Sequence, residues 1–316
     1  MHALNDETQT EFVDPWATPA PVPLPRRQLK ELRQRRDAPG LFYLIGHLAC
    51  VLATGVLAYL TLGEPLLLVP AMFVHGVVLV FLFAPMHECS HGTAFRRRWL
   101  NSVVGSICGF ILLRPSRYFK WRHAAHHSYT QDPARDPDLV PVPSNLREYF
   151  GNVVGGRLWP KLVGTLYRSA TGRFTADEQE WIPASERSKV VNQTRGMIVL
   201  YIVAIVASVA LRTPVLLWFW IVPRVLAEPA LRFIRMVEHT GMDEGADPLT
   251  NTRTTRPNPL VNFLYWNMPY HAEHHLTPSV PFHALRRMHE LLEDAPPAPS
   301  ILRVHRDLLT NLRSST

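Results

Sequence analysis

The chain has 316 residues, a formal net charge of +7 and only three cysteines, none in a CxxC pair, which excludes a disulfide framework and indicates a reducing compartment. Its mean hydropathy of −0.02 hides long apolar runs between charged stretches, as expected for a membrane protein with a large water-exposed part. The basic residues flank these runs, so the positive charge indicates a membrane surface and argues against nucleic acid as a partner.

Residues 1–38 are predicted to form a polar, partly disordered N-terminal tail. Residues 1–13 are acidic and polar, whereas a signal peptide begins basic and then becomes apolar, so we expect no cleavable signal. Residues 15–25 are rich in Pro and Ala, a composition typical of an extended or disordered chain.

Four apolar runs are candidates to cross a bilayer, which takes about 20 residues. Tight turns at residues 63–65 and 212–213 join the runs in pairs, and the runs themselves cover about residues 41–62, 66–86, 196–211 and 214–234. This pattern predicts an all-α integral membrane protein with four transmembrane helices in two hairpins, inside a domain of residues 39–293.

Basic residues gather on one side of the predicted hairpins. They cluster at residues 26–36, 96–98, 187–195 and 232–235, whereas the two hairpin turns carry only Glu64 and Arg212. By the positive-inside rule both termini face the cytosol. Residues 87–195 and 235–293 then form a cytosolic helical cap, followed by a C-terminal tail, 294–316. We expect a multi-pass protein of the bacterial inner membrane.

A shorter apolar segment, residues 99–113, follows the first hairpin. It is too short to span comfortably, so it is either an interfacial or re-entrant helix or a buried helix of the cap.

Three histidine boxes lie beside the predicted spans on the cytosolic side. The first has spacing HxxxH and the other two HxxHH; their histidines are His87 and His91, then His123, His126 and His127, then His271, His274 and His275. Positions i, i+3 and i+4 share one face of a helix. A merely solvated histidine-rich surface would not explain the repeated spacing.

The eight box histidines exceed the four ligands of a structural zinc ion and suit two metal ions with open positions. Nearby acids can accept the other ring N–H and orient each imidazole; the candidates are Glu88, Glu273, Asp132 and Asp136, the last two being equally well explained as solvated charge. His239 follows the fourth span by about one turn and is a ninth candidate ligand, with a surface histidine as the alternative.

The remaining histidines lack this spacing and are interpreted as structural or surface residues: His47, His75, His283, His289 and His305.

Four segments carry a resemblance to the membrane fatty acid desaturase and hydroxylase superfamily: HECSHGT at 87–93, WRHAAHHSYTQDP at 121–133, EHTGM at 238–242 and WNMPYHAEHHLTPSVPFH at 266–283. The resemblance implies a di-iron centre bound by the nine histidines under a membrane-embedded substrate tunnel. Glu238 and Asn267, within these segments, are further candidates to support the ligands or contact substrate. In stearoyl-CoA desaturases an Asn four residues before the isolated ligand holds a metal-bound water; here Arg235 stands there.

The resemblance implies oxygen-dependent chemistry in which hydrogen is abstracted from an unactivated C–H bond. Loss of a second hydrogen gives an alkene, and return of oxygen gives an alcohol. The same ligands serve both outcomes, so substrate positioning decides between them. No cytochrome b5 module is recognisable. We therefore expect a separate electron carrier, a ferredoxin or similar protein with its reductase, which the cytosolic Arg patches could dock.

Arg224 and Glu228 lie four residues apart, deep in the fourth apolar run. Intramembrane charges are often functional, so Arg224 could hold a substrate carboxylate; alternatively the two residues form a self-satisfying ion pair. Pro223 and Pro229 indicate a kinked helix there.

The sequence thus predicts a fatty-acyl lipid desaturase that uses two iron ions and O2. Alternatives in the same superfamily are a hydroxylase, a fatty acid decarboxylase that forms terminal alkenes, and a desaturase of a specialised metabolite. A non-redox zinc membrane hydrolase or a metal transporter is a more distant alternative, because a hydrolase needs only about three protein ligands.

Overall fold

A computed structural model describes residues 22–314, and every regular element in this range is a helix. The predicted tail at residues 1–21 lies outside the described residues. The helices are α1 (Arg26–Leu32), α2 (Asp37–Leu60), α3 (Pro65–Val80), α4 (Phe83–His91), α5 (Arg98–Ile111), α6 (Ser116–Ser128), α7 (Leu146–Val154), α8 (Leu158–Thr171), α9 (Ala176–Trp181), α10 (Ala184–Ala210), the π-helical η1 (Leu217–Ile221), α11 (Val222–His239), α12 (Pro248–Asn251), α13 (Pro259–Leu264), α14 (His271–Leu276), α15 (Phe282–Leu291) and α16 (Ile301–Ser314).

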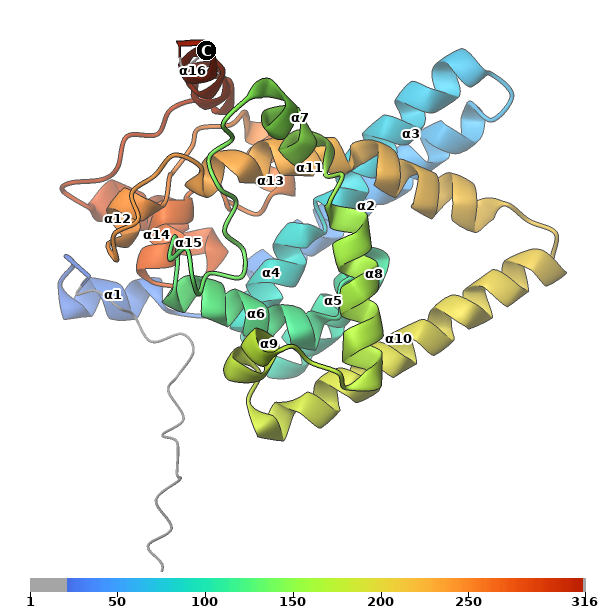
Figure 1. The fold of residues 1–316 in the computed structure, drawn as a ribbon, viewed down its shortest axis with the longest axis horizontal. Helices are drawn as coiled ribbons and strands as arrows, with labels where there is room; N and C mark the ends of the chain where they lie inside the picture. The colour runs from blue at the N-terminus through green and yellow to red at the C-terminus, as the bar shows by residue number, and fades with distance from the viewer. Residues whose placement is uncertain (1–21, 315–316) are drawn as a thin grey trace, which may run out of the picture.

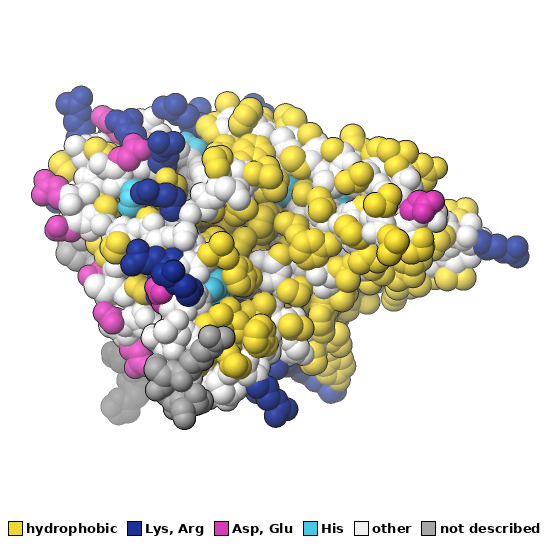
Figure 2. Space-filling view, turned by 90° about the horizontal axis from the view of Figure 1, so that it is seen from above, with side chains coloured by type: hydrophobic (Ala, Val, Ile, Leu, Met, Phe, Trp, Pro, Cys, Tyr) yellow, Lys and Arg dark blue, Asp and Glu magenta, His cyan; other side chains and the backbone are white. Residues whose placement is uncertain are grey.

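Three helices of the described chain are long and apolar enough to cross a membrane: α2, the rod Pro65–His91 formed by α3 and α4, and α10. Only 11% of the most apolar part of α2 and of α10 is buried. Their apolar side chains therefore cover one end of the molecule, whereas charged side chains gather at the other end (Figure 2). Such a large exposed apolar surface requires a lipid environment, and the chain is a membrane protein.

The two helical hairpins project from a compact group of shorter helices (Figure 1). The α2–α3 pair forms one hairpin, and α10 with η1 and α11 forms the other. The helix α10 begins at Ala184, well before the predicted span at 196–211, so its polar first turns extend into the cap.

The predicted fourth span, 214–234, forms η1 and the first part of α11. It is not among the three apolar candidates, because α11 carries charged residues along its length. It packs against α3 so closely that a Cβ at Gly76 would lie 2.0 Å from the carbonyl oxygen of Pro223. The π-helical turn stands directly before Pro223, as expected where a proline interrupts backbone hydrogen bonding.

The apolar segment predicted at 99–113 forms α5, which packs on α4. Its inner face buries Asn101, Val104 and Cys108, while Val103 and Ile107 remain exposed on its outer face. An apolar outer face next to a membrane span suits an interfacial helix.

The prediction of a C-terminal tail at 294–316 is corrected by α16. Leu312 packs with Tyr149 of α7 and Met236 of α11. His305 stacks on Phe233 with ring centroids 3.6 Å apart, and its ring lies 2.9 Å from the Tyr149 hydroxyl. The amphipathic character of these residues therefore produces a docked helix that covers the end of α11.

Candidate metal centre

The nine predicted histidines come together in two adjacent groups. Within each group one ring nitrogen per residue lies within 4.8 Å of all the others. The five-histidine group contains His87, His91, His123, His127 and His274, all buried. The four-histidine group contains His126, His239, His271 and His275, of which only His239 is half-buried.

The helical spacing of the boxes explains this division. At 3.6 residues per turn, positions i and i+4 diverge by about 40°, whereas i+3 lies about 100° away from i+4. On α6, His123 and His127 therefore enter the five-histidine group while His126 enters the other. On α14 the assignment is reversed, because His271 and His275 enter the four-histidine group and His274 the other.

The ring nitrogens of each group converge as metal donors do. The Nε2 atom of His123 lies 3.1 Å from that of His91, and the Nε2 atom of His239 lies 3.1 Å from that of His271. The Nε2 atoms of His274 and His275 are buried and have no hydrogen-bond partner among the described residues. Buried nitrogens facing one another in this way fit a bound cation.

Burial lowers the pKa of His127, His271 and His275 well below the ordinary histidine value. These imidazoles are therefore neutral at physiological pH, which is the form that binds a metal ion.

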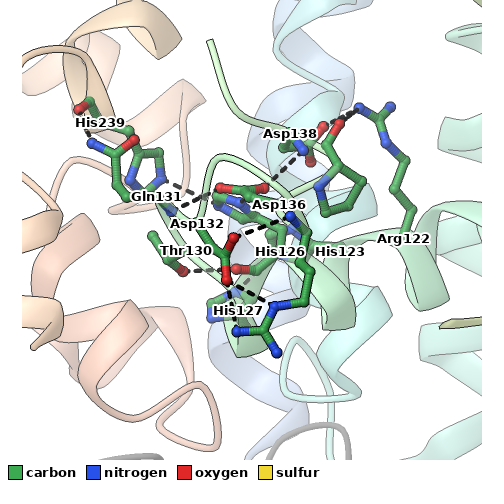
Figure 3. A network of polar contacts seen from close by, with 12 residues as sticks. Arg122, His123, His126, His127, Thr130, Gln131, Asp132, Asp136, Asp138 and His239 are labelled. Carbon is green, nitrogen blue, oxygen red and sulfur yellow. Dashed lines mark hydrogen bonds and ion pairs between the residues drawn. The ribbon is translucent and has the colours of Figure 1, made fainter. Parts of the chain in front are cut away.

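Outer hydrogen bonds orient the rings of the four-histidine group (Figure 3). His126 donates its Nδ1–H to Asp136 at 2.9 Å, and His275 donates its own to the Thr130 hydroxyl at 3.2 Å. Gln131 donates to the carbonyl oxygen of His239 at 2.7 Å. Burial lowers the pKa of His126, but the Asp136 carboxylate outweighs burial and raises it. An occupied Nδ1 directs Nε2 toward the metal position.

Glu88 is the acid of the five-histidine group. Its Oε1 atom lies 3.5 Å from Nδ1 of His87 and 3.9 Å from Nδ1 of His274. The other carboxylate oxygen accepts hydrogen bonds from the Thr93 hydroxyl and from the backbone N–H of Phe282. The carboxylate is thus fixed beside two rings at distances too long for direct hydrogen bonds.

Three predicted supporting residues do not reach a grouped imidazole. Asp132 caps Ala134 and pairs with Arg135 instead (Figure 3). Glu273 accepts a hydrogen bond at 2.6 Å from His289, which belongs to neither group. Asn267 lies in the turn before α14, with a positive φ of 54°, and bonds to Asn262 and Tyr43.

Glu238 lies on the metal-facing side of His271, with its Oε2 atom 3.7 Å from Nε2. Its other oxygen accepts a hydrogen bond from the Tyr265 hydroxyl at 2.7 Å. Burial raises the pKa of Glu238 to about 7, although the positive charge of Arg235 opposes the shift.

Several partners of the site were not predicted from the sequence: Thr130, Gln131, Asp138 and Tyr265. Asp138 forms an ion pair with Arg122 (Figure 3). Burial opposes ionisation of Asp138, but Arg122 outweighs it and holds the pKa of that carboxyl well below its usual range. The concentration of Asp and Pro at residues 132–138, directly after the second box, was the signal that could have indicated this loop.

Arg224 and Glu228 form the expected i,i+4 ion pair, and each side chain is 1% exposed. His47 and His75 bond to backbone carbonyls inside the hairpins, away from the two groups.

Comparison with known proteins identifies the chain's relatives. Residues 63–306 match the family described as fatty acid desaturase. The chain belongs to the fatty acid desaturase family. It is an oxidoreductase of that family, which uses iron, and its two histidine groups are a candidate position for the metal.

Individual desaturases are similar to the chain over most of its length. A dihydrorhizobitoxine desaturase of Bradyrhizobium elkanii is 27% identical, over 84% of this chain and 78% of the relative. An sn-1 oleoyl-lipid 12-desaturase of Picosynechococcus sp. is 22% identical over 76% of this chain and 73% of the relative. A Delta(12) acyl-lipid conjugase (11E,13E-forming) of Impatiens balsamina is 24% identical over 70% and 64%, respectively.

Proposed function

We propose that the chain is an O2-dependent di-iron membrane oxidase that introduces a C=C bond into a fatty-acyl or related lipophilic substrate. The observation that carries the proposal is the pair of buried imidazole groups, with five and four converging nitrogens, at the inner end of an apolar helix. Two groups suit two metal ions, and imidazole suits iron. The nine grouped histidines are the proposed ligands.

The reaction removes two hydrogen atoms from adjacent carbons of the substrate. Together with two electrons from a carrier and two protons, they reduce O2 to two molecules of water. Bound iron would supply the oxidising power for breaking an unactivated C–H bond. We propose that the electrons come from a separate carrier, a ferredoxin or similar protein, supplied by its own reductase.

The protein's own residues prepare this centre. Eight of the nine proposed ligands are buried, so water is largely excluded from the reacting groups. Asp136 and Thr130 hold the rings of His126 and His275 in their ligand orientation. Glu238, with its pKa near neutrality, can hold or release a proton beside the four-histidine group.

The proposed topology places α11 as a fourth span, shielded by its packing against α3, and gives two hairpins with both termini on the cytosolic side of a bacterial inner membrane. In this arrangement the two histidine groups lie at the cytosolic edge of the bilayer, and a lipophilic substrate reaches them from the membrane. The acyl-lipid desaturases and the conjugase among the relatives support an acyl substrate.

The test is expression of the full chain in a lipid-producing host, followed by iron analysis and mass spectrometry of lipids and volatile products. We expect two iron ions per chain and an oxygen-dependent product with one additional double bond at unchanged carbon count. His274→Ala should lose iron and product, while His283→Ala, outside both groups, should retain them. A protein that binds a single zinc ion and needs no oxygen would contradict the proposal, and a hydroxylated or shortened product would replace desaturation with one of the alternatives.

A further inference from the structure

A buried cluster of cations lies next to the five-histidine group. This inner cation cluster comes from α6, α8, α11 and the turn after α5, and it consists of Arg114, Arg122, Lys161, Arg224, Arg232 and Arg235. Three acids face it: Asp138, Glu228 and Glu238. Six cations therefore share three carboxylates in the protein interior.

The three acids already have partners. Asp138 is ion-paired with Arg122, and Glu228 with Arg224. Glu238 accepts a hydrogen bond from Tyr265 and lies 3.8 Å from Arg235. No acid of the cluster is left for the remaining cations.

Arg114 is the cation with the fewest contacts. The residue is 8% exposed, and among described residues its guanidinium makes no hydrogen bond. The Nε and Nη2 atoms of Arg224 are likewise buried, with no hydrogen-bond partner in the described chain. An unpartnered guanidinium in a protein interior is costly because its five N–H groups prefer charged acceptors.

The electrostatics of the cluster also favour an anion. Burial lowers the pKa of Arg114 to about 9 against the opposing charge of Glu228, with Arg235 and Arg224 lowering it further. Neighbouring Arg122, followed by burial, lowers the pKa of Lys161 to about 8. A negative charge placed among these groups would reverse both effects.

Phe83 connects this cluster to the metal centre. The guanidinium carbons of Arg235 and Arg114 lie 4.3 and 5.9 Å from the centre of the Phe83 ring. The same ring lies 5.9 Å from the ring of His87. An anion held by both arginines would therefore lie within one aromatic ring's reach of the five-histidine group.

We propose that Arg114 and Arg235, with Arg224 behind them, bind the carboxylate of a free-acid substrate, so that oxidation falls on carbons near the acid end. The inference rests on the proposed function and specifies its substrate class. A free carboxylate fits better than the phosphate of a membrane lipid, because the cluster is interior, whereas lipid phosphates remain at the membrane surface. Arginine pairs reach carboxylates in a bidentate geometry.

A second cationic site provides the competing location. A groove of about 710 Å³ between α4, α5, α6 and α10 opens beside His91 and carries Arg35, Arg98, Arg117, Lys120 and Lys189. Anion binding in that groove is the alternative that the experiment must separate.

The experiment measures equilibrium binding of a radiolabelled long-chain fatty acid and of its methyl ester to the full-length, iron-loaded protein in detergent without oxygen. We expect the wild type to prefer the acid. Arg114→Gln and Arg235→Gln should each weaken binding of the acid by roughly ten- to a hundredfold and leave the ester unchanged. Arg114→Lys, which keeps the charge, should retain part of the preference. Iron content and the midpoint of thermal unfolding report whether each variant is folded.

Arg98→Gln, in the groove, is the matched control and should leave the acid preference intact. Equal affinity of the wild type for acid and ester would overturn the inference, as would loss of the preference in Arg98→Gln but not in Arg235→Gln. If Arg114→Gln does not fold, the wild-type comparison and Arg235→Gln decide. Acid-selective binding without oxidation of any acyl compound would contradict only the proposed function. Oxidation of esterified chains without acid preference would contradict only this inference.

Discussion

The two histidine groups have the same kind of donor atom but are supported differently. In the four-histidine group, hydrogen bonds from Asp136 and Thr130 fix the outer nitrogens of His126 and His275. In the five-histidine group the rings pack on one another and on Phe119, and the acid Glu88 stays beyond hydrogen-bond distance of them. One group is therefore oriented chiefly by hydrogen bonds and the other chiefly by packing and an additional ligand.

The largest effect is expected from removing a ligand of the smaller group. His271→Ala leaves three imidazoles there, so it should abolish product formation and reduce bound iron to about half. His289→Ala, on the neighbouring helix α15, is the control and should retain iron. Iron analysis of the purified variants checks this, and full iron content in His271→Ala would show that the two groups do not bind separate ions.

Asp136→Asn should produce the next largest effect. The amide keeps the size of the side chain but weakens the hydrogen bond that orients His126, and loss of such a partner costs roughly ten- to a hundredfold in metal affinity. Asp132→Asn, in the same loop and without an imidazole contact, should change little. Competition with a chelator measures both affinities; equal losses would remove the role assigned to Asp136.

Glu88→Gln tests the group supported by packing. Because its oxygen lies 3.5 and 3.9 Å from the two ring nitrogens, we expect a loss of metal affinity at or below roughly tenfold, the lower end of the range for such partners. The same chelator assay applies. A loss as large as that of Asp136→Asn would show that the two groups are supported alike.

Thr130→Val should have the smallest effect. It removes one neutral hydrogen bond to His275, worth about 1 kcal/mol, and should weaken metal binding roughly fivefold. Ser128→Ala is the matched control, because the Ser128 hydroxyl bonds only to the carbonyl of Ala124. Metal affinity in Thr130→Val equal to that of Ser128→Ala would mean that packing alone holds His275.

Features that depend on neighbouring residues in the chain were predictable. The apolar runs gave two of the three long helices closely, at α2 and at the rod Pro65–His91. The spacing of the boxes indicated which histidines share a helix face. Helix ends were less predictable: α10 begins at Ala184 because good helix formers continue through its polar first turns, where hydropathy gives no signal.

Contacts between distant segments could not be read from the chain. Asp132 and Asp136 are four residues apart and chemically identical, yet only Asp136 meets an imidazole, because the loop turns one toward α6 and the other toward solvent. Glu273 stands within a box but faces His289. Such choices depend on how helices far apart in sequence are placed against one another.

Local periodicity and apolar run length thus specified a helical membrane protein and its set of candidate metal ligands, since both are properties of a few consecutive residues. Packing of α4, α6, α11 and α14 settled how those histidines divide into groups of five and four, and which acids and alcohols orient them. The same packing assembled the inner cation cluster from four separate segments. Its members are unremarkable in sequence, and only their proximity in the folded chain produces an excess of buried positive charge beside the metal centre.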